Sequence, residues 1–392
     1  MSWPGMRTQP CAHGLDKIIA ERSQIMISLV AGARPNFMKI APLVRALQEL
    51  GVRPRLVHTG QHYDERMSRT FFRELQIPEP DVNLEVGSGT DVWQISEIMR
   101  RLALEFTENR PRAVLVVGDV NSTLAAALTT SKLGIPLGHV EAGLRSYDRT
   151  MPEEINRIVT DSISDWLFTS EASAERNLRR EGVPPERIHP VGNVMIDTLL
   201  SHLDRAKALR FCEKLGLTAG QYAVLTLHRP SNVDSREQLE SIMRAVHGVS
   251  EQMPVVFPMH PRTAARMQEF GLLRRDGLNG FTPIEPQRYL AMLSLMEASR
   301  LVMTDSGGIQ EETTALRVPC LTLRANTERP VTIDVGSNQL VGWRTEDILA
   351  GVQRVFDGPR RIGQLPDNWD GRSAERIAQI MQMTRADYRG SS

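Results

Sequence analysis

The chain has 392 residues, 41% of them hydrophobic and 24% charged, and its 47 lysines and arginines balance its 47 aspartates and glutamates. This composition is typical of a globular protein and disfavours a disordered or membrane-embedded chain. The balanced charge argues against broad electrostatic binding of nucleic acid or of a membrane surface. At about 150 residues per domain the length predicts two or three domains, and we expect two.

The first 24 residues lack the uninterrupted apolar core of a signal peptide and include Asp16 and Glu21, so we expect a poorly ordered N-terminal extension over residues 1–24. Cys11, Cys212 and Cys320 lie far apart and form neither a disulfide framework nor a metal-binding pattern, which favours the reducing cytoplasm and predicts no metal site. No segment approaches the roughly 18 apolar residues that a membrane span requires.

Six short apolar runs follow one another between residues 25 and 193, with helix-like segments between them. Near-continuous apolar strands are typical of a parallel sheet that is covered on both faces. Segments 35–50 and 91–110 have apolar residues at helical spacing and are long enough to cross between parallel strands. The expected strands are 25–32, 54–60, 113–119, 136–143, 165–170 and 187–193.

A second set of apolar runs repeats this alternation at 222–228, 253–260, 280–285, 300–306, 318–323 and 338–342. We therefore predict an α/β protein with two Rossmann-like, doubly wound domains that face each other across a cleft, where a ligand would bind. The N-terminal domain is expected over 25–193 and the C-terminal domain over 194–373. A last helical pattern at about 374–390 fits either the second domain or a return to the first.

The stretch MTDSGG lies between an expected strand and an expected helix. Ser306, Gly307 and Gly308 there would let backbone N–H groups approach a phosphate at the positive end of the helix. Glu312, in the first turn, could accept hydrogen bonds from ribose hydroxyls. The alternative is that Asp305 or Ser306 merely caps the helix.

Basic residues also follow the expected strands. Arg34 follows the first strand and Lys39 lies one helical turn later, so both cations could face one anion in the cleft. Two His-Arg sets, beginning at His228 and His260, end successive strands of the second half. Taken singly, such residues are more often solvated surface cations or structural histidines.

Four carboxylates, Asp119, Glu141, Glu153 and Glu154, come from the ends of two neighbouring strands and the segment after them. Clustered carboxylates in a cleft raise one another's pKa values, which suits general acid and base catalysis. Each alone could instead be a strand end, a salt-bridge partner or a helix-opening acid.

Several common catalytic motifs do not occur. The sequence has no Walker A motif, GxSxG elbow or HExxH pair, and its first strand ends in AGARPN and not in GxGxxG. These observations weaken nucleotide hydrolysis, serine hydrolysis, zinc proteolysis and a nicotinamide or flavin enzyme.

The chain resembles the non-hydrolysing UDP-N-acetylglucosamine 2-epimerases. The matching stretches run in order over roughly 25 to 380: GARPNFMKIAPLVRAL, HTGQHYD, VVGDVNSTLAAALTTSKLGIPLGHVEAGLRS, MPEEINRIVTD, VGNVMIDTL, LTLHRPSNVD, MTDSGGIQEETTALRVPCLTLRANTERP and NQLVG. The resemblance implies a fold like that of GT-B glycosyltransferases, a homodimer, and reversible conversion of UDP-GlcNAc to UDP-ManNAc without a nicotinamide or a metal. The implied route removes the C2 proton, expels UDP to give 2-acetamidoglucal, and adds UDP back with C2 inverted.

The same resemblance assigns roles to individual residues. Asp119, Glu141 and Glu153 match the catalytic carboxylates, and His228 matches the catalytic histidine that contacts the diphosphate. It leaves open which carboxylate handles which proton. The matches in the UDP site are Arg34 and Lys39 near the phosphates, Ser306, Gly307 and Gly308 in the phosphate-binding turn, Glu312 at the ribose, and Arg329 as a further site residue.

Some positions depart from the pattern of many bacterial members. Ala33 and Asn36 replace residues of the usual GTRPE, and HRPSN replaces HRREN. Met292 stands where many members have a Phe near the uracil, so apolar contact replaces stacking. GQHYDERM differs from the GQHRxM form that serves a second, activating UDP-GlcNAc, so we do not expect that activation.

Other functions use parts of the same site. A close variant would epimerise a modified sugar, such as a UDP-2,3-diacetamido uronic acid, or hydrolyse the glucal and release ManNAc with UDP. A GT-B glycosyltransferase would use the same UDP site but gives no reason for three carboxylates. A nucleotide-sugar sensor would bind without turnover.

Overall fold

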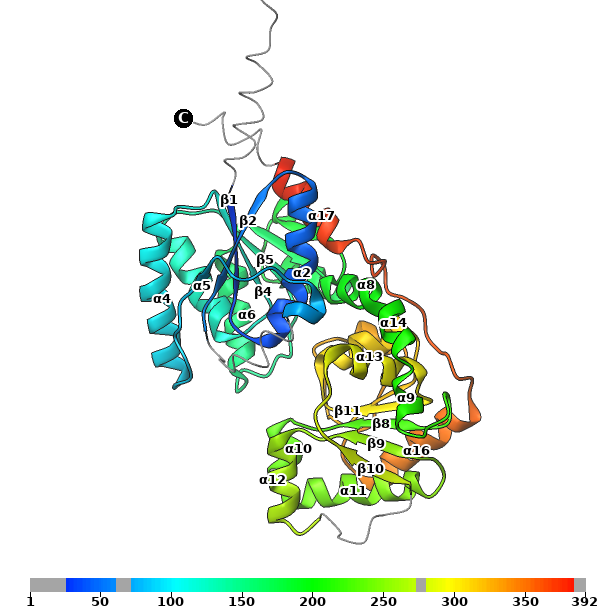
Figure 1. The fold of residues 1–392 in the computed structure, drawn as a ribbon. Helices are drawn as coiled ribbons and strands as arrows, with labels where there is room; N and C mark the ends of the chain where they lie inside the picture. The colour runs from blue at the N-terminus through cyan, green and yellow to red at the C-terminus, as the bar shows by residue number, and fades with distance from the viewer. Residues whose placement is uncertain (1–25, 61–71, 273–279, 384–392) are drawn as a thin grey trace, which may run out of the picture.

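A computed structural model describes residues 26–60, 72–272 and 280–383. Figure 1 shows two lobes, each built on its own sheet with helices packed around it. The expected N-terminal extension and most of the GQHYDERM segment lie outside the described residues. Among the described helices, none has the length and apolar character needed to span a bilayer.

The first lobe contains a parallel seven-stranded sheet in the order β3-β2-β1-β4-β5-β6-β7. All six strands expected between 25 and 193 are confirmed; β3 was missed because it has only two residues. The strands are β1 (Met26–Ala31), β2 (Arg53–His58), β3 (Val82–Asn83), β4 (Ala113–Val117), β5 (Leu137–Ala142), β6 (Trp166–Thr169) and β7 (Ile188–Pro190).

The second lobe contains a parallel six-stranded sheet in the order β10-β9-β8-β11-β12-β13. Its strands coincide with the six expected runs: β8 (Ala223–Thr226), β9 (Val255–Pro258), β10 (Phe281–Ile284), β11 (Leu301–Thr304), β12 (Cys320–Thr322) and β13 (Asn338–Leu340). The predicted class, an α/β protein with two doubly wound sheets, is therefore confirmed.

The helices follow from apolar spacing and from side-chain caps. In α4, Gln94, Ile98, Leu102 and Phe106 recur every four residues and are buried. Thr90 accepts a hydrogen bond from the Trp93 N–H at the start of this helix. The helices of the first lobe whose bounds the structure describes are α2 (Arg34–Glu49), α4 (Asp91–Glu108), α5 (Asn121–Lys132), α6 (Pro152–Ile163) and α7 (Ala172–Arg180), with the short 3₁₀ helix η1 (Pro185–Arg187). The helices that follow are α8 (Val194–Leu209), α9 (Phe211–Lys214), α10 (Pro230–Val233), α11 (Arg236–Ser250), α12 (Pro261–Glu269), α13 (Tyr289–Ala298), α14 (Gly307–Leu316), α15 (Val331–Asp334), α16 (Thr345–Asp357) and α17 (Ser373–Met383).

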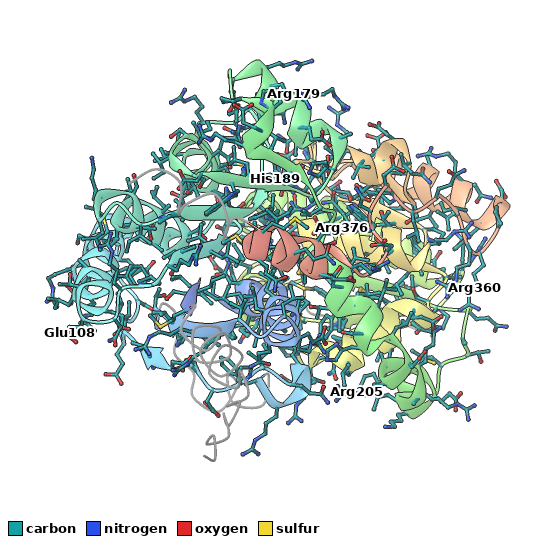
Figure 2. The ribbon with its side chains drawn as sticks, turned by 90° about the horizontal axis from the view of Figure 1, so that it is seen from above. Glu108, Arg179, His189, Arg205, Arg360 and Arg376 are labelled. Atoms are coloured by element: carbon teal, nitrogen blue, oxygen red, sulfur yellow. The ribbon has the colours of Figure 1, made fainter. Side chains whose placement is uncertain are left out.

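The last described helix, α17, returns to the first lobe and lies beside α2 (Figure 1). Its N-terminus is held by Asp197 of α8, whose carboxylate accepts hydrogen bonds from the Ser373 and Ala374 N–H groups. Arg376, labelled in Figure 2, donates to the Val191 carbonyl just before α8. Ile377 of α17 is fully buried in the core that α2 also enters. The domain boundaries at 193 and 373 remain predictions.

Each sheet reverses its strand order once, between β1 and β4 in the first and between β8 and β11 in the second. In doubly wound sheets the loops at this point diverge and leave a crevice beyond the carboxyl ends of the strands. The four strands at the two reversals are followed by Lys39, Asp119, His228 and Ser306. The fold therefore brings these four sequence-distant positions into one region.

Candidate active site

A cavity of about 390 Å³ lies between the two lobes. Eight of the twelve predicted site residues line it: Lys39, Asp119, Glu153, His228, Ser306, Gly307, Gly308 and Arg329. The first three come from the seven-stranded lobe, and the others come from the six-stranded lobe and its loops. The cavity thus has a carboxylate side and a glycine-rich side, as the strand-end positions predicted.

Glu141 lies just behind the cavity wall at the end of β5. Its backbone has a φ of +75° at a register shift between β5 and β6, a conformation that costs a residue with a side chain on the order of 1–3 kcal/mol. This bulge turns the Glu141 carboxylate toward two cations that line the cavity. One oxygen contacts the Lys39 ammonium, and the other accepts a 2.9 Å hydrogen bond from Arg329 Nη2.

Arg329 joins the lobes. Besides Glu141, its guanidinium lies 2.7 Å from Glu311 on α14 and 2.8 Å from the neighbouring Glu328. Burial opposes the charged form, but Glu311 and Glu328 outweigh burial and hold the pKa of Arg329 above its usual range. Arg329 is therefore a permanent, buried positive charge at the centre of the site.

Lys39 is the more adjustable cation. Burial lowers its pKa from 10.5 to about 8, although the charges of Asp119 and Glu311 favour the protonated form. A lysine with a pKa this close to neutral can carry a charge toward a phosphate or exchange a proton with a neighbouring carboxylate.

Asp119 and Glu153 present carboxylates to the cavity in different ways. Arg157 of α6 lies 2.5 Å from Asp119 and holds its carboxylate, which remains 30% exposed. Glu153, in the first turn of α6, is half-buried and makes no hydrogen bond or ion pair with any residue that the structure describes. Glu154, by contrast, is buried and accepts hydrogen bonds from the Ser146 N–H and from Arg157, so it serves the structure.

His228 follows β8 and is oriented by a buried carboxylate. Its Nδ1 lies 2.9 Å from Asp305 Oδ1, and its exposed edge faces the cavity. Burial alone would raise the pKa of Asp305, but hydrogen bonds from the His228 side chain and from the Arg229 and His228 N–H groups lower it. Asp305 thus fixes the ring orientation and leaves Nε2 for a ligand.

The N-terminus of α14 opens onto the same cavity. Ser306 occupies the N-cap position, but its side chain makes no capping hydrogen bond, and the Asp305 carboxylate serves His228 and Arg229. The capping alternative therefore does not account for these residues. A Cβ on Gly307 would lie 2.6 Å from Arg329 Nη1 and 3.1 Å from Glu328 Oε1, so a side chain at this position would push against the buried ion pair.

The family model described as UDP-N-acetylglucosamine 2-epimerase matches residues 45–382, which is most of the chain. The chain belongs to the UDP-N-acetylglucosamine 2-epimerase family. It is 41% identical over 366 residues to the UDP-N-acetylglucosamine 2-epimerase of Methanocaldococcus jannaschii, covering 91% of this chain and 98% of that enzyme. The resemblance seen in the sequence motifs is therefore confirmed.

This UDP-N-acetylglucosamine 2-epimerase family member is also similar to two solved structures and to a further relative. The M. jannaschii enzyme in complex with UDP-GlcNAc and UDP superposes with a TM-score of 0.84 over 92% of this chain and all of that one. A UDP-2,3-diacetamido-2,3-dideoxy-D-glucuronate 2-epimerase of Pseudomonas aeruginosa is 38% identical over 91% of this chain and 99% of its own. WaaG, a glycosyltransferase involved in lipopolysaccharide biosynthesis, has a TM-score of 0.56, covers 94% of this chain and all of its own, and at 12% identity shares the fold alone.

Two residues predicted for the UDP site of this family member, Met292 and Glu312, do not line the cavity, and the structure does not test a third. Arg34 begins α2, but its side chain lies outside the described part of the chain. Met292 is half-buried on α13, against the core. Glu312 lies beyond the first turn of α14, contrary to the prediction, because the helix begins at Gly307. It is buried beside Tyr289, and burial raises the pKa of its carboxyl to about 8. Their roles in UDP binding stay predictions.

Sequence reasoning missed several residues that shape the site. Glu311 and Glu328 hold Arg329, and Arg157 holds Asp119. A sequence signal for Arg157 existed, because Arg157 lies in the stretch MPEEINR, one helical turn after Glu153. No local pattern distinguishes Glu311 from Glu312, because that choice depends on which face of α14 meets the cavity.

Glu312→Gln is expected to make the stability of the protein less dependent on pH. Folding raises the pKa of Glu312 from 4.5 to about 8. The folded protein therefore keeps a proton that the unfolded chain releases between these values, and this stabilisation is lost as the pH rises through the folded pKa. Glutamine has no proton to release, so the variant should gain a few kcal/mol relative to the parent between about pH 5 and about pH 8, at about 1.4 kcal/mol per pKa unit.

Urea unfolding curves at these two pH values measure the effect. Glu108→Gln, at an exposed position labelled in Figure 2, is the matched control and should show no relative gain. Equal pH dependence of the Glu312→Gln variant and the parent would contradict the prediction.

Proposed function

We propose that this protein is a non-hydrolysing UDP-N-acetylglucosamine 2-epimerase that interconverts UDP-GlcNAc and UDP-ManNAc. The observation that carries the proposal is one cavity with Asp119 and Glu153 on one side and the N-terminus of α14 with His228 on the other. The first side suits a sugar whose C2 proton must move, and the second suits a diphosphate. The M. jannaschii relative that binds UDP-GlcNAc and UDP supports the same assignment.

The diphosphate is proposed to sit at the start of α14. The N–H groups of Gly307 and Gly308 point out of the helix at its positive end, and His228, Lys39 and Arg329 line the same cavity. These donors would stabilise the negative charge that UDP acquires as it leaves the sugar. A proton on C2 is only weakly acidic, so a stabilised leaving group is what makes its removal feasible.

The reaction is proposed to proceed by elimination and re-addition. A carboxylate takes the C2 proton, the electron pair of the C2–H bond forms the C1=C2 double bond, and the C1–O bond breaks with its electrons staying on UDP. The 2-acetamidoglucal then receives a proton at C2 on the opposite face while a UDP oxygen re-forms the bond to C1. Protons and electrons balance, and no redox partner is needed.

We assign the two proton transfers to Asp119 and Glu153, one on each face of the sugar. Both line the cavity, and Glu153 is free of any partner among the described residues. Glu141 is almost fully buried and contacts Lys39 and Arg329, so its charge sets the position and protonation of these cations. All three carboxylates are therefore needed for turnover.

Proton NMR of the anomeric region in D₂O tests the proposed function. Purified protein with UDP-GlcNAc should give a second UDP-sugar and place deuterium at C2 of both. Stoichiometric release of UDP with free ManNAc would instead identify a hydrolysing enzyme. A requirement for an acceptor, with no exchange in its absence, would identify a glycosyltransferase.

One alternative substrate has its own support, because the P. aeruginosa relative that is named for a diacetamido glucuronate matches the same 91% of the chain as the M. jannaschii enzyme does. Exchange at C2 measured with a panel of UDP-GlcNAc and UDP-2,3-diacetamido uronic acids distinguishes the two. Faster exchange with UDP-GlcNAc supports the proposal, and exchange confined to the uronic acids overturns it in favour of the alternative.

Gly308→Ala is expected to weaken UDP binding while leaving the folded protein intact. The nearest atom to an added Cβ is Met195 Cε at 3.9 Å, an ordinary contact, so the free protein has room for it. A diphosphate bound against this turn would collide with the added methyl group. We therefore expect a tenfold loss of UDP affinity, which corresponds to about 1.4 kcal/mol. Calorimetric titration of UDP measures the change, with Gly248→Ala in α11 as the helical control. Unchanged UDP affinity in both variants would show that the phosphates do not bind at this turn.

We also propose that the protein is a homodimer. Helix α4 exposes Trp93 and Leu104, at 45% and 58%, on one face. Large exposed apolar side chains on one helix face are typical of an interface. Light scattering should give the mass of a dimer for the parent and of a monomer for Leu104→Asp, while Leu365→Asp, at another exposed leucine, should remain dimeric; a monomeric parent would contradict this.

The cytoplasm is the proposed location. Cys212 and Cys320 are buried free thiols, which suits a reducing compartment. Cell fractionation with an antibody to the chain would test this.

A further inference from the structure

His139 is a buried histidine that sequence reasoning did not single out. It lies on β5, two residues before Glu141, and is fully buried. Its Nδ1 lies 2.6 Å from Asp161 Oδ1, and its Nε2 lies 2.8 Å from the Gly118 carbonyl oxygen. Both ring nitrogens are therefore in hydrogen-bonding contact, one with α6 and one with the turn after β4.

Both partners of this ring can only accept. A backbone carbonyl has no proton to give. Asp161 is ionised, because the Arg145 guanidinium lies 2.7 Å from its Oδ2 and the same oxygen accepts a hydrogen bond from the Gly143 N–H at 3.0 Å. For both contacts to be hydrogen bonds, each ring nitrogen must carry a proton, and the ring is then an imidazolium.

We propose that His139, as a buried imidazolium paired with Asp161, is a positioning residue that fixes the backbone of the two site carboxylates Asp119 and Glu141. The inference rests on the proposed function, in which Asp119 transfers a proton at the sugar and Glu141 positions Lys39 and Arg329. His139 does not touch the cavity and acts only through the chain segments that it holds.

The first segment is the turn at Gly118, directly before Asp119. Gly118 has a φ of +67°, and its N–H donates to the Val140 carbonyl at 3.1 Å. A Cβ here would lie 3.2 Å from the Lys39 ammonium, so the turn runs directly against the site. Its carbonyl accepts a hydrogen bond from His139 Nε2, and a rotation of this peptide would displace Asp119.

The second segment is the strained bulge at Glu141. His139 precedes the bulge, and Gly143, with a φ of +82°, follows it. The His139–Asp161 pair holds both ends, the first through the ring and the second through the Gly143 N–H. A left-handed conformation at a residue with a side chain persists only where surrounding contacts enforce it, and this pair supplies such contacts.

Charges of alternating sign extend outward from the proposed imidazolium. Asp161 carries the negative charge, Arg145 lies 2.7 Å from its other oxygen, and Glu181 lies 2.6 Å from Arg145. Two positive and two negative charges thus alternate in one row. His189 on β7 provides a contrast, because its Nε2 has no partner among the described residues and burial lowers its pKa.

Nitrogen NMR of the parent enzyme tests the protonation directly. Spectra of the ring nitrogens at about pH 8, where an ordinary histidine is neutral, should show both nitrogens of His139 protonated and one nitrogen of His189 bare. The His189→Gln and His139→Gln variants assign the signals. One bare ring nitrogen on His139 at this pH would overturn the inference.

Kinetics test the positioning role. His139→Gln keeps a hydrogen-bond donor but removes the charge. Asp161→Asn keeps the histidine ring but removes the carboxylate that pairs with it. The second variant keeps the test valid if the first does not fold. Both should lower the turnover number for C2 exchange roughly 100-fold, as a small displacement of reacting groups does. KM and UDP affinity should change little, because all the donors proposed for the diphosphate except Lys39 lie on the other lobe.

His189→Gln, at a position labelled in Figure 2, is the matched control and should exchange at the parent's rate. Parent-like exchange in folded His139→Gln and Asp161→Asn proteins would overturn the inference. A failure of the proposed function would look different, because the parent itself would then exchange no deuterium into any UDP-sugar of the panel.

Discussion

Asp119→Asn is expected to lower the rate of C2 exchange at least roughly 100-fold while UDP affinity stays close to that of the parent, since one general acid or base typically contributes 10²–10⁴-fold. The amide keeps the size of the side chain, and the Asp119 carbonyl keeps its hydrogen bond from Asn156 at 2.8 Å. What is lost is the group that takes or gives the C2 proton. The diphosphate site is built from other residues, so binding persists.

Deuterium incorporation at C2 in D₂O and calorimetric titration of UDP measure the two halves of this prediction. Asp204→Asn, at an exposed position of α8, is the matched control and should behave as the parent. Normal exchange in the Asp119→Asn protein would show that the catalytic assignment is wrong. Parallel losses of exchange and UDP affinity would show that Asp119 acts in binding.

Arg329→Met should be the most destabilising single change in the site. The guanidinium is the shared partner of Glu141, Glu311 and Glu328, and all four side chains are at most 10% exposed. Methionine retains most of the apolar stem but leaves three buried carboxylates without this partner. Removing one member of a buried ionic group typically costs about 3–5 kcal/mol of stability.

Chemical unfolding measures this loss, and C2 exchange by the folded fraction should also be strongly reduced because Glu141 and the diphosphate site lose a cation. Arg354→Met, at an exposed position of α16, provides the control and should stay within about 0.5 kcal/mol of the parent. If Arg329→Met is as stable as this control, the buried network is not what joins the lobes.

The fold was predictable because its elements obey local rules. Parallel strands buried on both faces appear in the sequence as apolar runs, and twelve such runs became β1, β2 and β4–β13. The two-residue β3 has no such run, because pairing with β2 and not composition makes it a strand. The return of α17 to α2 also depends on tertiary contacts, including the Asp197 cap, that periodicity does not contain.

The candidate site was predictable to the extent that strand ends determine it. Asp119, His228 and Ser306 follow strands at the two reversals of strand order, so topology alone brings them to one crevice. The partners of these residues were not predictable in the same way. Arg329 meets Glu141 across 188 positions of sequence, and no local pattern encodes such a contact.

The central claim is that one UDP-sugar lies between the lobes with its diphosphate at α14 and its pyranose ring between two carboxylates. A crystal structure of the protein with UDP-GlcNAc bound tests this most directly. We predict phosphate oxygens at the N–H groups of Gly307 and Gly308 and at His228 Nε2, and C2 of the sugar between Asp119 and Glu153. A uridine diphosphate bound outside the cavity, or carboxylates turned away from the ring, would contradict the account.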